Sequence, residues 1–261
     1  MTQLARPDLA RNGTNRGHVA PAASAVPGAA YLRRLARSAA WRTSASQSVP
    51  GWAVISAFLA PGLLVGAWLI SAALQPASYS PVRQTMSVLA GQGATDRWLM
   101  TSALFVVGLC QIVTAVGLTR VGTPARILLV VTGLSSIGVA ASPEPAAGPT
   151  PRHLAFAVIC VVATAAWPAL IARRSPAKPW ILTIRGCTIV TGVFAVMSTW
   201  VLIESQGGNY LGLAERLTSS VQGIWPFVVA LALRHAARQA RNRKIADEDR
   251  PVLAVPNQRR G

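Results

Sequence analysis

Six apolar stretches of membrane-spanning length determine what this 261-residue chain can fold into. They cover residues 52–74, 98–118, 127–142, 154–172, 186–203 and 217–233. At ~1.5 Å rise per residue, each stretch comes close to the ~30 Å thickness of the hydrocarbon core of a bilayer. Helices of water-soluble proteins keep one polar face, and these stretches have none. The sequence therefore predicts an all-α fold, a polytopic membrane bundle of six transmembrane helices.

Lysine and arginine are distributed unevenly over the segments that join these stretches. When successive helices cross the membrane in alternating directions, 21 of these residues lie on one side of it, in the two tails and in the second and fourth connections. The other four lie on the opposite side. The four on the second side are matched by four acidic residues, so the whole net charge of +17 lies on one face. Basic segments stay in the cytoplasm. We therefore expect both termini inside a cytoplasmic (inner) membrane, with residues 51–235 as the transmembrane domain.

The positive charge does not indicate nucleic-acid binding. Basic residues without interleaved aromatic side chains are typical of the inner surface of a membrane protein. No metal site and no cofactor is predicted, because His18 and His235 fall inside and only His153 falls outside, so a multi-histidine site cannot form at the outer face. Membrane lipids are the expected partners, and the sequence does not define the oligomeric state.

Both tails are predicted to be cytoplasmic and basic. Residues 1–50 lack an apolar run that could offset the entropy of ordering, so we expect disorder there. Within them, residues 31–41 have the pattern of a short basic amphipathic helix for anionic headgroups, and a solvated helical stub is the alternative. An arginine-rich leader also resembles a transit peptide, but the same arginine density in the tail 236–261 favours the membrane explanation. The first part of that second tail should extend the last helix.

The outer face carries the polar residues from which a site could be built. The candidates for ligand binding are Arg83, Gln84, Asp96, His153, Glu215 and Arg216. An arginine at a helix N-terminus needs a partner, so we expect Arg216 to pair with Asp96 or Glu204, or to bind an anionic headgroup. We expect the charged candidates to approach one another, because isolated charges at the ends of apolar spans are costly. Ordinary anchoring in the headgroup layer is the alternative for each single residue.

Catalysis receives less support from the sequence. Ser87, His153 and Asp96 are the best candidates for a nucleophile, a base and an orienting acid on the outer side. However, the chain has no HExxH, no G-x-S-x-G and no paired histidine ligands on one helix, so the sequence favours a role without catalysis and leaves a hydrolase or transferase as the alternative. The absence of acids and bases from the middle of the spans also argues against a proton-coupled or ion-coupled transporter.

Two smaller structural predictions follow from residue spacing. Gly62 and Gly66 form a Gly-x-x-x-Gly pair, which permits close contact between helices. In the first outer loop, residues 82–89 have apolar side chains at helical spacing, so we expect a short helix there. Polar uncharged side chains within the spans, such as Gln111, Ser136 and Ser198, should form hydrogen bonds between helices.

Several segments resemble the bacterial integral membrane family catalogued as domain of unknown function 998. They are YSPVRQTMSVL at 79–89, GATDRWLM at 93–100, Pro143 with His153, GLAER at 212–216 and the Trp-Pro pairs at 167–168 and 225–226. The resemblance covers about residues 52 to 233, and it implies six membrane helices without an established activity, cofactor or substrate. We therefore expect a multi-pass membrane protein with an outer site for a small anionic or lipid headgroup ligand, in an accessory or lipid-handling role. The alternatives are a membrane-embedded hydrolase or transferase and a purely structural membrane partner.

Overall fold

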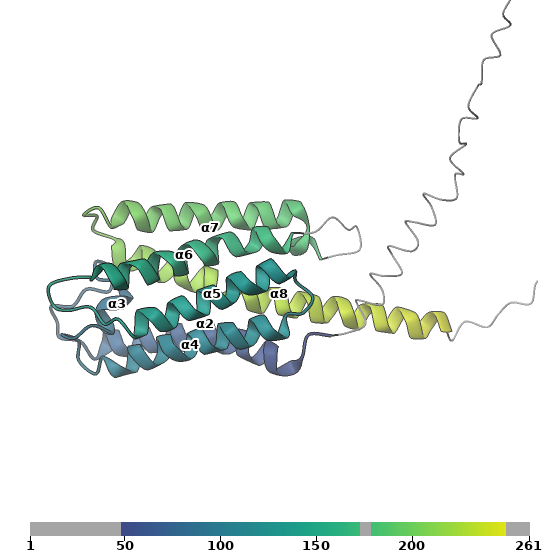
Figure 1. Ribbon diagram of the computed structural model, residues 1–261, viewed down its shortest axis with the longest axis horizontal. Coiled ribbons are helices and arrows are strands. Elements are labelled where there is room, and N and C mark those ends of the chain that lie inside the picture. The colour runs from purple at the N-terminus through teal and green to yellow at the C-terminus, as the bar shows by residue number, and fades with distance from the viewer. Residues whose placement is uncertain (1–47, 173–178, 249–261) are drawn as a thin grey trace, which may run out of the picture. The chain divides into compact units, whose positions relative to one another are not determined.

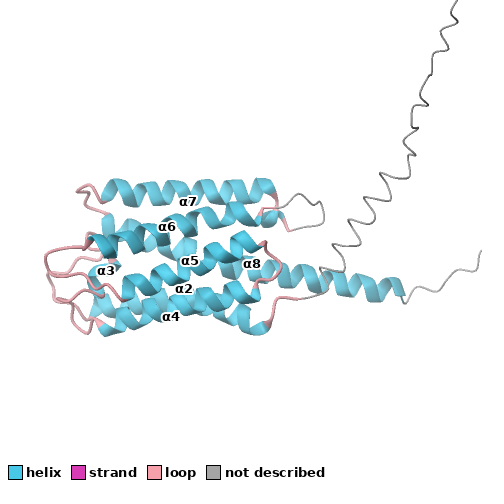
Figure 2. Cartoon of the chain, in the orientation of Figure 1, coloured by secondary structure: helices cyan, strands magenta, loops and turns pink. Residues whose placement is uncertain are grey.

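The computed structural model describes residues 48–172 and 179–248, which form seven α-helices, one short 3-10 helix and no β-strand (Figures 1 and 2). The elements are α2 (Gly51–Ala73), α3 (Met86–Leu89), α4 (Trp98–Gly117), α5 (Thr123–Ala140), α6 (Pro151–Ile171), η1 (Trp180–Leu182), α7 (Ile184–Glu204) and α8 (Leu211–Glu248). All but α3 and η1 are long and apolar enough to cross a membrane. The predicted all-α bundle of six spans is confirmed.

The six long helices form a ring in chain order. Each packs against the next, and α8 closes the ring by packing against both α7 and α2. Short connections join the helices at alternate ends of the bundle, with α3 at one end and the extension of α8 at the other (Figure 1). The sequence pattern explains this arrangement, because short loops between apolar helices make consecutive helices antiparallel neighbours.

The outward faces of the helices are apolar. Phe58, Leu69, Val196 and Leu202 are each more than half exposed, and they are four of many large apolar side chains on the outside of the bundle. A contiguous apolar surface of this kind would aggregate in water and is typical of a surface that faces lipid. The protein is therefore a multi-pass membrane protein.

Small and polar residues hold the helices together inside the bundle. A Cβ added at Gly108 would lie 2.5 Å from the carbonyl oxygen of Gly133, and the reverse holds as well, so α4 and α5 meet through these two glycines. Ser136 Oγ on α5 donates a hydrogen bond of 2.8 Å to the carbonyl of Leu104 on α4. Gly62 and Gly66, in contrast, have open space around them. The predicted close contact at that pair is therefore not made with any residue that the structure describes.

The connection between α2 and α4, residues 75–97, folds over one end of the bundle, and we call it the cap. Its short helix was predicted over residues 82–89 but begins only at Met86, where the Thr85 hydroxyl accepts a hydrogen bond from the amide of Val88. The carbonyls of Pro81 and Gln84, just before this helix, bind a side chain of α8 instead of continuing a helix. A tertiary contact thus decides the start of α3.

The last span also begins earlier than its sequence indicates. Glu215 and Arg216 were expected to precede the helix, but α8 begins at Leu211 and includes both. They lie one turn inside the helix because both side chains have partners within the protein. At its other end α8 continues through the basic residues to Glu248, as their spacing predicts. The predictions for residues 1–47, including the amphipathic helix at 31–41, and for 249–261 lie outside the described residues.

Candidate functional site

Arg216 is a buried charged side chain of the capped end, with 4% of its surface exposed. Its Nη1 donates to the carbonyl oxygens of Pro81 at 2.6 Å, Gln84 at 2.7 Å and Gly212 at 2.9 Å. Its Nη2 donates to the hydroxyl of Tyr79. Hydrogen bonds from a charged group are about twice as strong as neutral ones. The guanidinium therefore fastens two turns of the cap to α8.

Gly212 allows this contact to be so close. A Cβ at this position would lie 2.6 Å from the carbonyl oxygen of Pro81 and even nearer to that of Gln84. One residue further, the amide of Leu213 donates to the carbonyl of Val82 at 3.0 Å. The first turn of α8 and the cap thus meet backbone to backbone, and only glycine fits between them.

Glu215 fastens a second point of the cap. Its Oε2 accepts a hydrogen bond of 2.5 Å from the amide of Met86, the first residue of α3. A carboxylate is favourable there because the first amides of a helix have no partner within the helix. Glu215 also interacts electrostatically with Arg216, Glu144 and His153, so these four side chains form one group, which we call the buried charge cluster.

The other two members of this cluster form an ion pair between the α5–α6 connection and α6. His153, 2% exposed, places Nε2 3.0 Å from Oε1 of Glu144 and Nδ1 2.7 Å from the carbonyl oxygen of Ser142. A carbonyl only accepts, so Nδ1 carries a hydrogen, and one further proton is shared between Nε2 and the carboxyl group. The carbonyl of Glu144 accepts from the amide of Gln92 at 2.8 Å, which joins this pair to the cap.

Tyr79 completes the surroundings of Arg216. It is half-buried, and burial raises the pKa of its phenol above the ordinary value of 10.0, against the opposing effect of the Arg216 guanidinium. The phenol is therefore neutral at physiological pH and accepts the hydrogen bond from Nη2. Trp68 of α2 lies on another side of Arg216, with its ring centroid 5.4 Å from the guanidinium carbon, within the range of a cation–π contact.

Two buried donors in this region have no partner among the described residues. They are Nε of Arg216 and the indole Nε1 of Trp68, on side chains that lie against each other. The hydroxyl of Ser142, next to the ion pair of His153, is also buried and without a partner. A buried donor left unsatisfied costs roughly 1–3 kcal/mol, so native proteins leave few of them without a protein, water or ligand acceptor. The unpaired donors of Arg216 and Trp68 are therefore available to an acceptor from outside the chain.

The family model described as "Protein of unknown function (DUF998)" matches residues 58–232. The chain belongs to the DUF998 family. The matched range contains the whole cap, the buried charge cluster and Trp68. No curated protein and no solved structure matches the chain. The family thus agrees with the membrane fold and leaves the chemistry to be argued from the residues.

In this DUF998 chain, the structure brings some of the predicted site residues together and separates others. His153, Glu215 and Arg216 meet in the buried charge cluster. Arg83, Gln84 and Asp96 are exposed on the cap, and of these only Gln84 touches the cluster, through its backbone carbonyl.

The expected ion pair of Arg216 with Asp96 or Glu204 is not formed among the described residues. Glu204 instead accepts from the amide of Tyr210 at 2.8 Å, and Asp96 is exposed. Backbone carbonyls and a phenol satisfy the guanidinium because the cap folds directly over it. Within the described residues, no group of three or more potential metal ligands occurs.

Sequence reasoning selected Glu144 and Tyr79 only as polar residues of the outer face, not as candidates for ligand binding, and it did not indicate Trp68 or Gly212 as site residues. Glu144 was the only acid in the connection before His153, a signal that could have identified it as the partner of that histidine. Tyr79 opens the motif that carries the family resemblance. Trp68 and Gly212 gave no such signal, because an aromatic residue and a glycine near a span end are ordinary in membrane helices.

The candidate nucleophile arrangement is not assembled in this structure. Ser87 lies in α3 and is half-buried, and its hydroxyl makes no hydrogen bond to His153 in the described part of the chain. Both nitrogens of His153 are engaged, one by the Ser142 carbonyl and one by Glu144. General base catalysis needs an imidazole nitrogen within hydrogen-bonding reach of the nucleophile. The geometry therefore gives the hydrolase alternative no support.

Proposed function

We propose that this membrane protein binds one small anionic group, most simply the phosphate of a lipid headgroup, at the capped end of the bundle. In this proposal the capped end is the outer face of a cytoplasmic membrane and both tails are cytoplasmic, as the distribution of basic residues indicates. The role is an accessory or lipid-handling one, without chemistry on the ligand.

The observation that carries the proposal is the pair of buried donors without a partner, Nε of Arg216 and Nε1 of Trp68. Both are N–H groups, so they need an acceptor, and an anionic oxygen is the strongest one. The two side chains are neighbours, with the indole ring centroid 5.4 Å from the guanidinium carbon, so in this proposal the oxygens of one anionic group accept from both donors. Arg216 is positively charged in any protein environment, which favours an anion over a neutral acceptor.

Exposed arginines at the capped end also favour an anion. Arg83 and Arg152 at the same end are exposed and add positive charge near the membrane surface. Such charges raise the local concentration of anionic groups.

The test compares two tryptophan variants. Trp68→Phe keeps an aromatic ring beside Arg216 but removes the unsatisfied N–H. Trp225→Phe is the matched control, because Trp225 also has a buried indole N–H without a described partner, in the middle of α8 and away from the cap. The full-length proteins are purified in mild detergent, and retained lipids are counted by native mass spectrometry.

We expect Trp68→Phe to weaken the binding of one retained anionic lipid about tenfold, as loss of one charge-assisted contact implies, while Trp225→Phe retains that lipid. Equal retention in both variants and wild type would contradict the proposal and leave a structural role for the cluster. Ser87→Ala provides the arm for the hydrolase alternative: a lipid profile of the producing cells altered by Ser87→Ala but not by Trp68→Phe would favour catalysis.

A further inference from the structure

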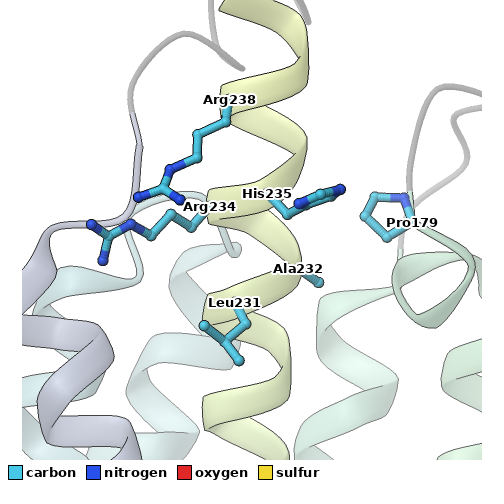
Figure 3. A pocket seen from close by; sticks show the side chains of 6 residues that line it. All are labelled: Pro179, Leu231, Ala232, Arg234, His235 and Arg238. Atoms are coloured by element: carbon cyan, nitrogen blue, oxygen red, sulfur yellow. The ribbon is translucent and has the colours of Figure 1, made fainter.

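A second polar region lies at the end of the bundle opposite the cap. An open groove of about 490 Å³ runs beside α8 there and is lined by Pro179, Leu231, Ala232, Arg234, His235 and Arg238. Figure 3 shows Arg234 and Arg238 extending to the same side of α8, whereas His235 points toward Pro179. The lining combines apolar side chains on the bundle side with basic groups further along the helix.

The two guanidinium groups lack an anionic partner among the described side chains. They are four residues apart on one helix, so they face the same side and repel each other. The only ion pair between described side chains is that of Glu144 with His153, at the capped end. An anion between the two arginines would relieve the repulsion.

The groove lies at the level of a membrane surface. Arg216 and Arg234 are 18 residues apart on the same helix, which corresponds to ~27 Å and matches the hydrocarbon thickness of ~30 Å. Trp52 and Trp180, both about half exposed, mark this same end of the bundle. Tryptophan is enriched at the boundary between hydrocarbon and headgroups. Leu231, 43% exposed, is therefore within reach of acyl chains, while Arg238 is at headgroup height.

From this geometry we infer that the basic side of α8 next to this groove binds the headgroup of an anionic phospholipid, with Arg234 and Arg238 on the phosphate and Leu231 against the glycerol and upper acyl chains (Figure 3). Basic pockets between membrane helices are suited to such lipids, because charge attracts the headgroup and the apolar wall fixes its position. This site is separate from the one at the cap, and it uses none of the same residues.

The test uses two double variants of the full chain. Arg234→Gln with Arg238→Gln removes both groove arginines, and Arg241→Gln with Arg243→Gln removes two exposed arginines of the same helix that do not line the groove. Purified proteins are incubated with an equimolar mixture of phosphatidylglycerol and phosphatidylcholine, and bound lipids are counted by native mass spectrometry. We expect the groove variant to bind phosphatidylglycerol about tenfold more weakly and the control to bind it like wild type.

A third variant keeps the charge and removes the apolar contact. Leu231→Ala is expected to lower phosphatidylglycerol binding as well, because Leu231 is exposed beside the two arginines, and melting temperatures equal to that of wild type establish that the variants fold. Equal loss in both double variants would overturn the site in favour of diffuse attraction, and unchanged binding in the groove variant would overturn it outright. Competition by soluble glycerol 3-phosphate as effective as by lipid would replace the lipid with a free phosphate ester. Trp68→Phe leaves this groove intact, and the groove variants leave the cap intact. The experiments can therefore refute the site beside α8 and the site at the cap independently of each other.

Discussion

Replacing Gly212 with alanine should detach the cap from α8. The added Cβ would lie 2.6 Å from the carbonyl oxygen of Pro81, whereas ordinary contacts begin at 3.4 Å, so the cap must move by at least about 0.8 Å, because the carbonyl of Gln84 is nearer still. A shift of that size lengthens the Arg216 hydrogen bonds to the Pro81 and Gln84 carbonyls, now 2.6 and 2.7 Å, to the limit of hydrogen bonding. Losing two bonds to a charged donor at roughly 1.5–3 kcal/mol each, less about 1 kcal/mol of helix propensity gained, gives a loss of about 2–5 kcal/mol.

Gly223→Ala is the matched control for this prediction. It makes the same change in the same helix, but its Cβ would meet only Pro61, at 4.0 Å. We expect thermal unfolding in detergent, followed by tryptophan fluorescence, to show a clearly lower melting temperature for Gly212→Ala. The control should melt at or above the wild-type temperature, because alanine favours the helix by up to about 1 kcal/mol.

Proteolysis reports on the same movement locally. Trypsin should cut after Arg83, in the cap, faster in Gly212→Ala than in Gly223→Ala, because the cap backbone is no longer held by α8. If Gly212→Ala melts like the control and its cap resists trypsin equally, the close backbone contact between α8 and the cap does not contribute to stability, and the reasoning is refuted.

Three further variants test other parts of the structure. Asp96→Gly should change the free energy of unfolding by no more than about 1 kcal/mol, because Asp96 is exposed and has a φ of 49°, which glycine adopts freely. Lipid binding should be unchanged, and its loss would show that Asp96 belongs to the binding site. Gly133→Ala should destabilise by about 1–3 kcal/mol, since its Cβ would lie 2.5 Å from the Gly108 carbonyl, whereas Gly62→Ala should melt like wild type; equal melting temperatures would contradict the α4–α5 contact. The pKa of the Tyr79 phenol is raised in the folded state, so the phenol contributes fully to stability below the ordinary value of 10.0, and this contribution is lost as the pH rises through the pKa of the folded state. The difference in unfolding free energy between wild type and Tyr79→Phe should therefore shrink from about pH 8 to strongly alkaline pH. A difference that stays constant over this range would argue against the contact between Tyr79 and Arg216.

The sequence was sufficient for the fold because the apolar stretches leave few alternatives. A chain cannot leave backbone groups unpaired in lipid, so each stretch becomes a helix, and short connections make neighbours antiparallel. The spans expected at 98–118 and 186–203 agree closely with α4 and α7. The span expected at 217–233 was too short, because Glu215 and Arg216 were interpreted as the end of an apolar run when they are buried with partners inside the helix.

The site was less predictable because its partners are mostly backbone atoms. The acceptors for Arg216 are carbonyls of the cap, which no pattern of side chains reveals. The carbonyl of Ser142, which orients His153, is equally invisible in the sequence. Gly62 and Gly66 show the converse. They form a recognisable pattern but have open space around them, whereas Gly108 and Gly133, which form no such pattern, make a close contact between α4 and α5.

The central claim, that an anion completes the hydrogen bonding of Arg216 and Trp68, is tested most directly by an experimental density map of the protein purified with its native lipids. The account predicts density of phosphate size within hydrogen-bonding distance of both Arg216 Nε and Trp68 Nε1, continuous with a lipid. A map in which only an ordered water, or a protein group, occupies that position would contradict it.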